Sequence, residues 1–210
     1  YNYVGVNAAN GNPIYESYNR DADGNITETI LVQADLTKQA YYVYNADNPT
    51  DLSTVRALSA TRDRVILGSA LPTWFGGLDN TLSFGNFDVN FLIRFSGGNK
   101  IMNRTRADLM GMTFNNNSTE ILGRWQSPEN PGDGQTPKLF LNRDALVNNP
   151  DFASTRFVED GDFVRLQNLS LSYRFSESSL KSLGLSSARV YVQGQNLVTL
   201  TGYSGLDPET

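Results

Sequence analysis

The sequence predicts an all-β fold: a partial antiparallel transmembrane β-barrel with long extracellular loops and short periplasmic turns. Two hairpins alternate between apolar and polar side chains. Their strands have about the 9–11 residues that a tilted strand needs to cross a bilayer. The turns within the hairpins are short, whereas the stretch between them is very long. This difference in loop length is typical of bacterial outer-membrane barrels.

The first hairpin spans residues 74–95. Gly85-Asn86 predicts its two-residue turn, because both central residues of a type I′ turn need positive φ. This turn places Phe84 opposite Phe87, so the apolar faces of the two strands coincide. We expect this face to contact lipid, because its apolar band begins and ends in aromatic residues. Its members are Trp74, Leu82, Phe84, Phe87, Val89, Phe91, Ile93 and Phe95.

The second hairpin spans residues 163–199. Its predicted lipid-facing residues are Leu169, Leu171, Tyr173 and Phe175. The link at 176–187 is expected to form a turn or two of helix, with Ser176 as its cap, Leu180 and Leu183 on its inner side and Gly184 at its end. The opposite, polar face of both hairpins is expected to line the barrel lumen through Asp88, Asn90, Arg94, Asn168, Arg174 and Gln193.

Two longer regions are predicted to be mainly extracellular. Residues 1–73 are expected to form a partly strand-forming loop, with a turn at 21–24 and a strand near 41–44. Residues 96–162 are too long for an ordinary connection. Ile101, Thr105, Leu109 and Met112 recur there at helical spacing and predict a short amphipathic helix near 100–112. Residues 200–210 are expected to begin a further loop.

Three loop residues are candidates for binding. Arg104 and Arg106 are positively charged and suited to an anionic substrate or partner, although a solvated loop face explains them better. Trp125, in a proline-rich stretch, is suited to stacking on a sugar ring, or alternatively to anchoring its own loop.

Composition excludes several kinds of chemistry. The 210 residues contain no His and no Cys, which removes Cys/His zinc sites, Ser-His-Asp triads and thiol nucleophiles. A net charge of -5 argues against a nucleic-acid partner. Asp160 and Asp162 are weighed as a glycosidase-type carboxylate pair, and 21–25 as a calcium loop, but a strand start and a polar turn explain them better. We therefore expect no enzyme activity, no metal and no cofactor.

Several segments resemble the SusC/RagA family of TonB-dependent transporters. The segment 157–169, FVEDGDFVRLQNL, is similar to a signature near the end of such proteins, and 190–197 with 201–209, ending in YSGLDPE, is similar to another. GSALPTWFGG at 68–77 resembles the family's start of a barrel hairpin, and Arg124-Trp125 with the prolines that follow resembles a family loop. The matches lie in order over residues 60–210.

The resemblance implies a large plugged barrel of about 22 strands in a bacterial outer membrane. It also implies import of oligosaccharides or peptides, a SusD-like surface lipoprotein as a partner, and TonB coupling through an N-terminal region. The chain has no signal peptide at its start and ends in a turn-like sequence. We therefore expect it to be a C-terminal piece that lacks the plug domain and closing strands. The lumen-facing residues would then hydrate the interior or contact the plug, rather than recognise a specific ligand.

Two alternative functions remain at this point. A SusC-like barrel can serve as a structural or assembly platform without import, because a fold does not fix a function. A soluble, secreted, carbohydrate-binding β-sandwich would also show alternating strands.

Overall fold

The computed structural model describes residues 1–35, 37–111, 116–139 and 154–209, and within that range not the side chain of Leu183. The chain divides into two compact units, which are described separately below. Unit 1 comprises Tyr1–Leu67 and Met102–Val158, and unit 2 comprises Gly68–Ile101 and Glu159–Thr210. The two regions predicted as separate extracellular loops therefore contribute to one unit.

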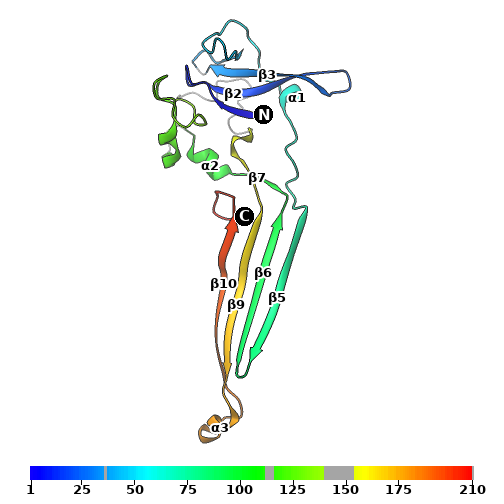
Figure 1. Ribbon diagram of the computed structural model, residues 1–210, viewed down its shortest axis with the longest axis vertical. Coiled ribbons are helices and arrows are strands. Elements are labelled where there is room, and N and C mark those ends of the chain that lie inside the picture. Colours follow the sequence, from blue (N-terminus) through cyan, green and yellow to red (C-terminus); the bar gives the residue numbers. More distant parts are fainter. Residues whose placement is uncertain (36, 112–115, 140–153, 210) are drawn as a thin grey trace. The chain divides into compact units, whose positions relative to one another are not determined.

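Unit 1 contains an antiparallel sheet whose strands follow chain order (Figure 1). The strands are β1 (Tyr3–Val6), β2 (Pro13–Arg20), β3 (Ile26–Asp35) and β4 (Ala40–Val43). The predicted turn joins β2 to β3: the Asp21 carboxylate accepts the N–H groups of Asp23 and Asn25, and Gly24 has a φ of 88°. The predicted strand near 41–44 is confirmed as β4.

The core of unit 1 has two hydrophobic clusters. Side chains from the sheet and the stretch before α1 (Ala60–Asp63) form the larger cluster: Tyr1, Tyr15, Val32, Ala34, Tyr41 and Leu58. Ala107, Met110 and Phe157 form the smaller cluster, beside α2 (Arg104–Leu109), η1 (Thr119–Gly123) and η4 (Thr155–Phe157). Residues 1–73 are thus more ordered than a loop, because tyrosine and aliphatic side chains on alternate positions find partners across the sheet.

The predicted helix near 100–112 is shorter than expected and has a different inner face. Residues Lys100–Met102 form strand β7, which pairs with β8 (Val158–Asp160). α2 begins after Asn103, whose side chain accepts the N–H of Arg106. Ala107 and Met110 are buried, whereas Thr105 and Leu109 are exposed. Met112 lies outside the described residues.

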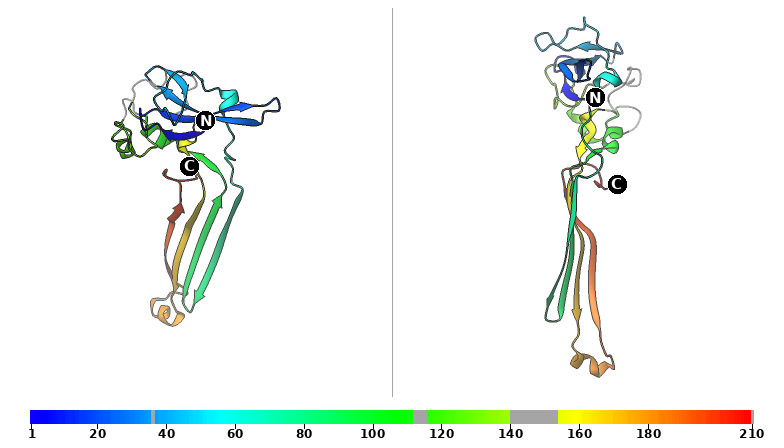
Figure 2. Two further views of the ribbon diagram at one scale, coloured as in Figure 1. Left: turned by 45° about the horizontal axis from the view of Figure 1, so that its top comes forward. Right: turned by 90° about the vertical axis from the view of Figure 1, so that its right-hand side faces the viewer.

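Unit 2 contains the two predicted hairpins, β5 (Trp74–Phe84) with β6 (Phe87–Gly97), and β9 (Phe163–Arg174) with β10 (Arg189–Thr201). They form one antiparallel sheet in the order β10-β9-β6-β5, and Figure 2 shows it from two further sides. Phe84 lies opposite Phe87, as the Gly85-Asn86 turn predicted. That turn lies at the same end of the sheet as the short link between β9 and β10 (Figure 1).

The β9–β10 link is helical, as predicted. It contains α3 (Glu177–Leu180) and η5 (Lys181–Leu183), and it ends at Gly184, whose φ of 67° is left-handed. Ser176 takes the N-cap position, but its hydroxyl contacts those of Ser178 and Ser179 and makes no side-chain cap hydrogen bond. Leu180 is buried. No helix among the described residues is both long and apolar enough to cross a membrane.

The sheet of unit 2 contains aligned β-bulges. Leu92, Asn168 and Gln195 lie in one row across β6, β9 and β10, and Ile93, Leu166 and Val198 lie in the next row. Between these rows β6 has no extra residue, β9 has Gln167, and β10 has Asn196 and Leu197. Asn196 has a φ of 50°, a conformation that non-glycine residues rarely adopt outside such irregularities. Pairing below and above the bulges remains regular.

Candidate functional site: the two faces of the unit 2 sheet

The strand register settles which side chains of unit 2 share a face. Side chains alternate along a strand, and residues directly opposite each other in adjacent strands point to the same side. Phe87 lies opposite Tyr173, Val89 opposite Leu171, and Phe91 opposite Leu169. All the residues predicted to face lipid therefore lie together on one side, the apolar face: Trp74, Leu82, Phe84, Phe87, Val89, Phe91, Ile93, Phe95, Leu169, Leu171, Tyr173 and, by alternation past the end of β9, Phe175.

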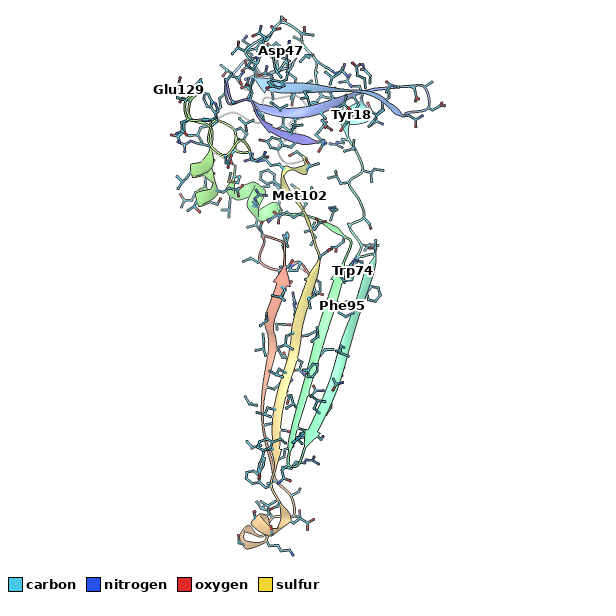
Figure 3. All side chains as sticks on the ribbon, in the orientation of Figure 1. Tyr18, Asp47, Trp74, Phe95, Met102 and Glu129 are labelled. Atoms are coloured by element: carbon cyan, nitrogen blue, oxygen red, sulfur yellow. The ribbon has the colours of Figure 1, made fainter. Side chains whose placement is uncertain are left out.

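Aromatic rings occur at both ends of this apolar face. At one end Trp74 and Phe95 come from neighbouring strands, with their ring centroids 6.3 Å apart (Figure 3). At the end near the short turns, Tyr173 contacts both Phe87 and Phe175, at 4.8 and 5.1 Å. Large apolar side chains on this face are exposed, and the exposed fraction of Phe84 is 90%. An apolar area of this size requires an apolar environment or a partner.

The opposite, polar face has a continuous row of hydrogen bonds across all the strands. The Gln193 amide donates to Asn168 at 2.9 Å, and the Asn168 amide donates to Asn90 at 3.4 Å. The Asn90 amide in turn donates to the Asp79 carboxylate and the Thr81 hydroxyl, at 3.1 and 3.0 Å. Because the amides of Asn168 and Asn90 both donate and accept, the row fixes the side-chain orientations across β5, β6, β9 and β10.

Two ionic groups lie on the same polar face. Near the short turns Arg174 pairs with Asp88 at 3.0 Å, and Asp88 also accepts the Ser83 hydroxyl at 2.6 Å. At the other end, Arg94 lies directly opposite Arg165 of β9. All the residues predicted to face the lumen, Asp88, Asn90, Arg94, Asn168, Arg174 and Gln193, are therefore on this face.

Sequence analysis did not single out Arg165, which is the most enclosed charge on the polar face. Its guanidinium contacts Asp207 at 2.7 Å, Glu209 at 2.8 Å and the Thr199 hydroxyl at 3.0 Å, and it stacks on the Phe163 ring. The local signal was its place between the apolar Val164 and Leu166, but the bulge at Gln167 shifts this alternation relative to that of Leu169 and Leu171. Its two carboxylate partners are distant in the sequence, and alternation cannot identify them.

The carboxylates of the segment 159–162 each have a structural partner. Glu159 accepts the N–H and the hydroxyl of Ser204, Asp160 pairs with Lys100, and Asp162 accepts the N–H of Gly98 at 2.7 Å. Through these contacts the segment 159–162 joins the strands to the neighbouring loops. Among the described residues, no group of His, Cys, Asp or Glu is arranged to hold a metal ion.

The loop candidates for binding lie in unit 1, where each is engaged within the protein. The indole N–H of Trp125 donates to the Ala8 carbonyl at 2.7 Å, and its ring lies against Gly11, where a Cβ would come within 2.6 Å of it. This contact favours the anchoring role. Arg104 forms an exposed ion pair with Asp108. Arg106 forms two hydrogen bonds with Glu120 and stacks on Phe157.

Unit 1 also encloses a charged group that sequence analysis missed. Asp63 is fully buried and accepts the N–H groups of Tyr18 and Ser59, the Ser17 hydroxyl and the Arg62 guanidinium. Burial raises the pKa of Asp63, but these hydrogen bonds outweigh burial and hold the pKa below its usual range. The network joins β2 to α1 and is structural.

The chain is similar to several curated proteins. It is 37% identical over 150 residues to TonB-dependent receptor P3 of Formosa agariphila, covering 71% of this chain and 14% of that protein. It is 32% identical over 151 residues to TonB-dependent receptor P26 of the same organism, covering 71% of this chain and 15% of that protein. TonB-dependent receptor SusC of Bacteroides thetaiotaomicron is 26% identical over 142 residues, and the match covers 63% of this chain and 12% of that protein. The chain thus spans about one seventh of these relatives.

Solved structures give the same relationship. The structure of the RagAB peptide transporter matches with a TM-score of 0.70 and 25% identity, covering 99% of this chain and 20% of that chain. The RagAB peptide importer in the open-open state matches with a TM-score of 0.63 and 23% identity, a likeness of fold. No family model matches the chain.

Proposed function

We propose that this chain supplies part of the barrel wall of an importer. The proposal starts from the fact that the chain belongs to the SusC/RagA family of TonB-dependent receptors. TonB-dependent receptors are outer-membrane β-barrel proteins and transporters, not enzymes. In this proposal the receptor takes up oligosaccharides or peptides, acts with a SusD-like surface lipoprotein, and receives energy from TonB through a plug-bearing N-terminal region. The barrel has about 22 strands.

The observation that carries the proposal is the separation of the two faces of the unit 2 sheet. Strands of 11, 11, 12 and 13 residues have an apolar side bounded by aromatic rings and a polar side joined by hydrogen bonds. This is the pattern of a barrel wall between lipid and a hydrated lumen. We assign the apolar face to lipid and the polar face to the lumen. The short turns are then periplasmic, and unit 1 is extracellular.

Deletion of the TonB-contact segment from the full-length receptor tests the proposal. The expected result is loss of uptake of a labelled oligosaccharide or peptide, with the receptor still present in the outer membrane. The two substrate classes are offered separately, because RagAB is a peptide transporter and the sequence matches SusC as well. Normal surface assembly of partner proteins, combined with no uptake by the intact receptor, would instead favour the platform role. A stable monomer in buffer without detergent would contradict the barrel assignment.

A further inference from the structure

Two arginines face each other at one end of the polar face. Arg94 of β6 and Arg165 of β9 are directly paired in the sheet, so both side chains leave it on the same side. Like charges in directly opposite positions destabilise a sheet unless other groups neutralise them. Neither β5, which has Gly77 in this row, nor β10, which has Thr199, provides a negative charge there.

The neutralising charges come from the segment that follows β10. Residues 202–209, here called the strap, fold back so that Asp207 and Glu209 reach the polar face. Arg165 contacts both carboxylates and retains only 8% exposure of its side chain. Glu209 also pairs with Arg94 at 3.0 Å. One carboxylate therefore bridges both arginines, and the second completes the neutralisation of Arg165.

The strap also makes polar contacts near its start and at its end. At its start, Tyr203 donates its N–H to the Thr201 hydroxyl, and Ser204 donates to Glu159. At its end the Asp207 carboxylate accepts the N–H of Glu209. Leu206, the large aliphatic side chain of the strap, is 98% exposed. Ion pairs and hydrogen bonds therefore hold the strap in place, together with the buried ring of Pro208.

We propose that the strap is an ionically held gate over the lumen-facing end of β6 and β9, which opens when Arg165 loses its carboxylate partners and thereby changes the passage of substrate. Breaking one side of an enclosed ion pair is strongly unfavourable, because the remaining charge keeps its desolvation cost without its partner. The strap is therefore expected to stay closed while both carboxylates are charged, and to open when they are neutralised or removed. The effect on passage rests on the proposed function, whereas the closed and open states of the strap do not.

The electrostatics of the strap agree with this proposal. Hydrogen bonds from the Glu209 N–H and from Arg165 hold the pKa of Asp207 below its usual range. Arg94, Arg165 and Glu159 face the strap, and Glu209 is the second charged group on it. A carboxylate with a depressed pKa stabilises the closed state at neutral pH and loses this effect as the pH falls through that pKa.

Spin labels in the full-length receptor measure the position of the strap directly. One label is placed at Leu206→Cys, on the exposed part of the strap, and the other at Asn80→Cys, on β5. The closed strap gives one narrow distance component. The double variant Asp207→Asn/Glu209→Gln is expected to lose that component and to change the rate of substrate uptake. Arg165→Gln should do the same from the sheet side of the contact.

A matched control separates the strap from a general loss of charge. Arg174→Gln removes the other arginine–carboxylate pair on the same face and should leave the narrow component intact. Persistence of the narrow component in Asp207→Asn/Glu209→Gln would overturn the proposal, and this variant leaves every strand residue unchanged. Equal loss in Arg174→Gln would overturn it too. Loss of the component with unchanged uptake would overturn the gate role. A native receptor that imports nothing would instead refute the proposed function, while the distances would still report on the strap.

Discussion

Each compact unit contains a four-stranded antiparallel sheet, but the two sheets treat their apolar side chains in opposite ways. Unit 1 buries them in the clusters around Tyr15 and Met110. Unit 2 exposes them: Phe84 and Phe87 lie on an open face, while polar side chains on the other face bond to one another. A sheet that bonds its polar groups internally and leaves its apolar groups exposed is suited to lipid outside and water inside. The same secondary structure thus encloses its apolar side chains in one unit and leaves them on an open face in the other, which suits the proposed contact with lipid.

The largest expected effect is in the buried network of unit 1. Asp63→Ala leaves the Arg62 guanidinium and the N–H groups of Tyr18 and Ser59 without their carboxylate, at a cost of about 3–5 kcal/mol. Hydrogen exchange of the Tyr18 and Ser59 amides in the full-length receptor should accelerate strongly. Asp47→Ala, at an exposed position of the same unit, is the control and should leave those amides protected. Equal effects of the two variants would contradict the structural role of Asp63.

The same carboxylate predicts a pH dependence. The pKa of Asp63 lies below its ordinary value of about 3.9 when the protein is folded. Its stabilisation is therefore complete above the unfolded pKa and is lost as the pH falls through the folded pKa. The difference in exchange between the native receptor and Asp63→Asn should narrow on acidification below about pH 4. A difference that persists unchanged into acid would show that the charge is not the stabilising feature.

Matched leucine truncations compare the two sheets directly. Leu58 is 1% exposed in the core of unit 1, and Leu58→Ala should cost about 2–5 kcal/mol of local stability. Leu82 is 57% exposed on the apolar face of unit 2, and Leu82→Ala should cost much less in a membrane, because it leaves no enclosed cavity. Denaturant titration in detergent, followed by hydrogen exchange of each unit, measures both. A larger effect at Leu82 would place that face in a protein core.

Adjacent arginine substitutions test which face meets lipid. Phe91→Arg introduces a charge near the middle of the apolar face and should cost about 2–4 kcal/mol of barrel stability. Leu92→Arg places the same charge on the polar face, in the same row as Asp79 and Asn168, and should cost much less. Barrel folding into lipid vesicles of defined thickness, followed by gel mobility without heating, compares the two. The reverse order would exchange the lipid and lumen assignments.

The smallest expected effect is at the exposed helix of unit 1. Arg104→Ala removes an exposed i,i+4 pair with Asp108 and should change stability by less than about 0.5 kcal/mol. Arg106→Ala removes the contacts to Glu120 and Phe157 and should cost more. Both variants are also tested for uptake. A strong loss of uptake in Arg104→Ala with unchanged stability would restore Arg104 as a binding residue.

The faces of the unit 2 sheet could be predicted from the sequence because alternation is a local property of a strand. The Gly85-Asn86 turn then fixed the register of one hairpin, and the assignment followed for the other. The predicted inner face of α2 was wrong because Ile101 belongs to strand β7. Ile101 and Leu109 therefore do not lie on one helix. The Arg165 cluster and the composite core of unit 1 depend on contacts between distant segments. Periodicity contains no information on such contacts.

The aligned bulges of unit 2 have a consequence for assembly. A uniform ladder of alternating residues can slide by two positions and still present the same chemistry on each face. Here β6, β9 and β10 hold zero, one and two additional residues between the same two rows. A slip of β10 along β9 would bring Asn196, in its left-handed conformation, against a regular stretch of β9. A slip of β9 along β6 would bring the additional Gln167 against a regular stretch of β6. The bulges therefore favour one register, both within the second hairpin and between the two hairpins, as the barrel wall assembles.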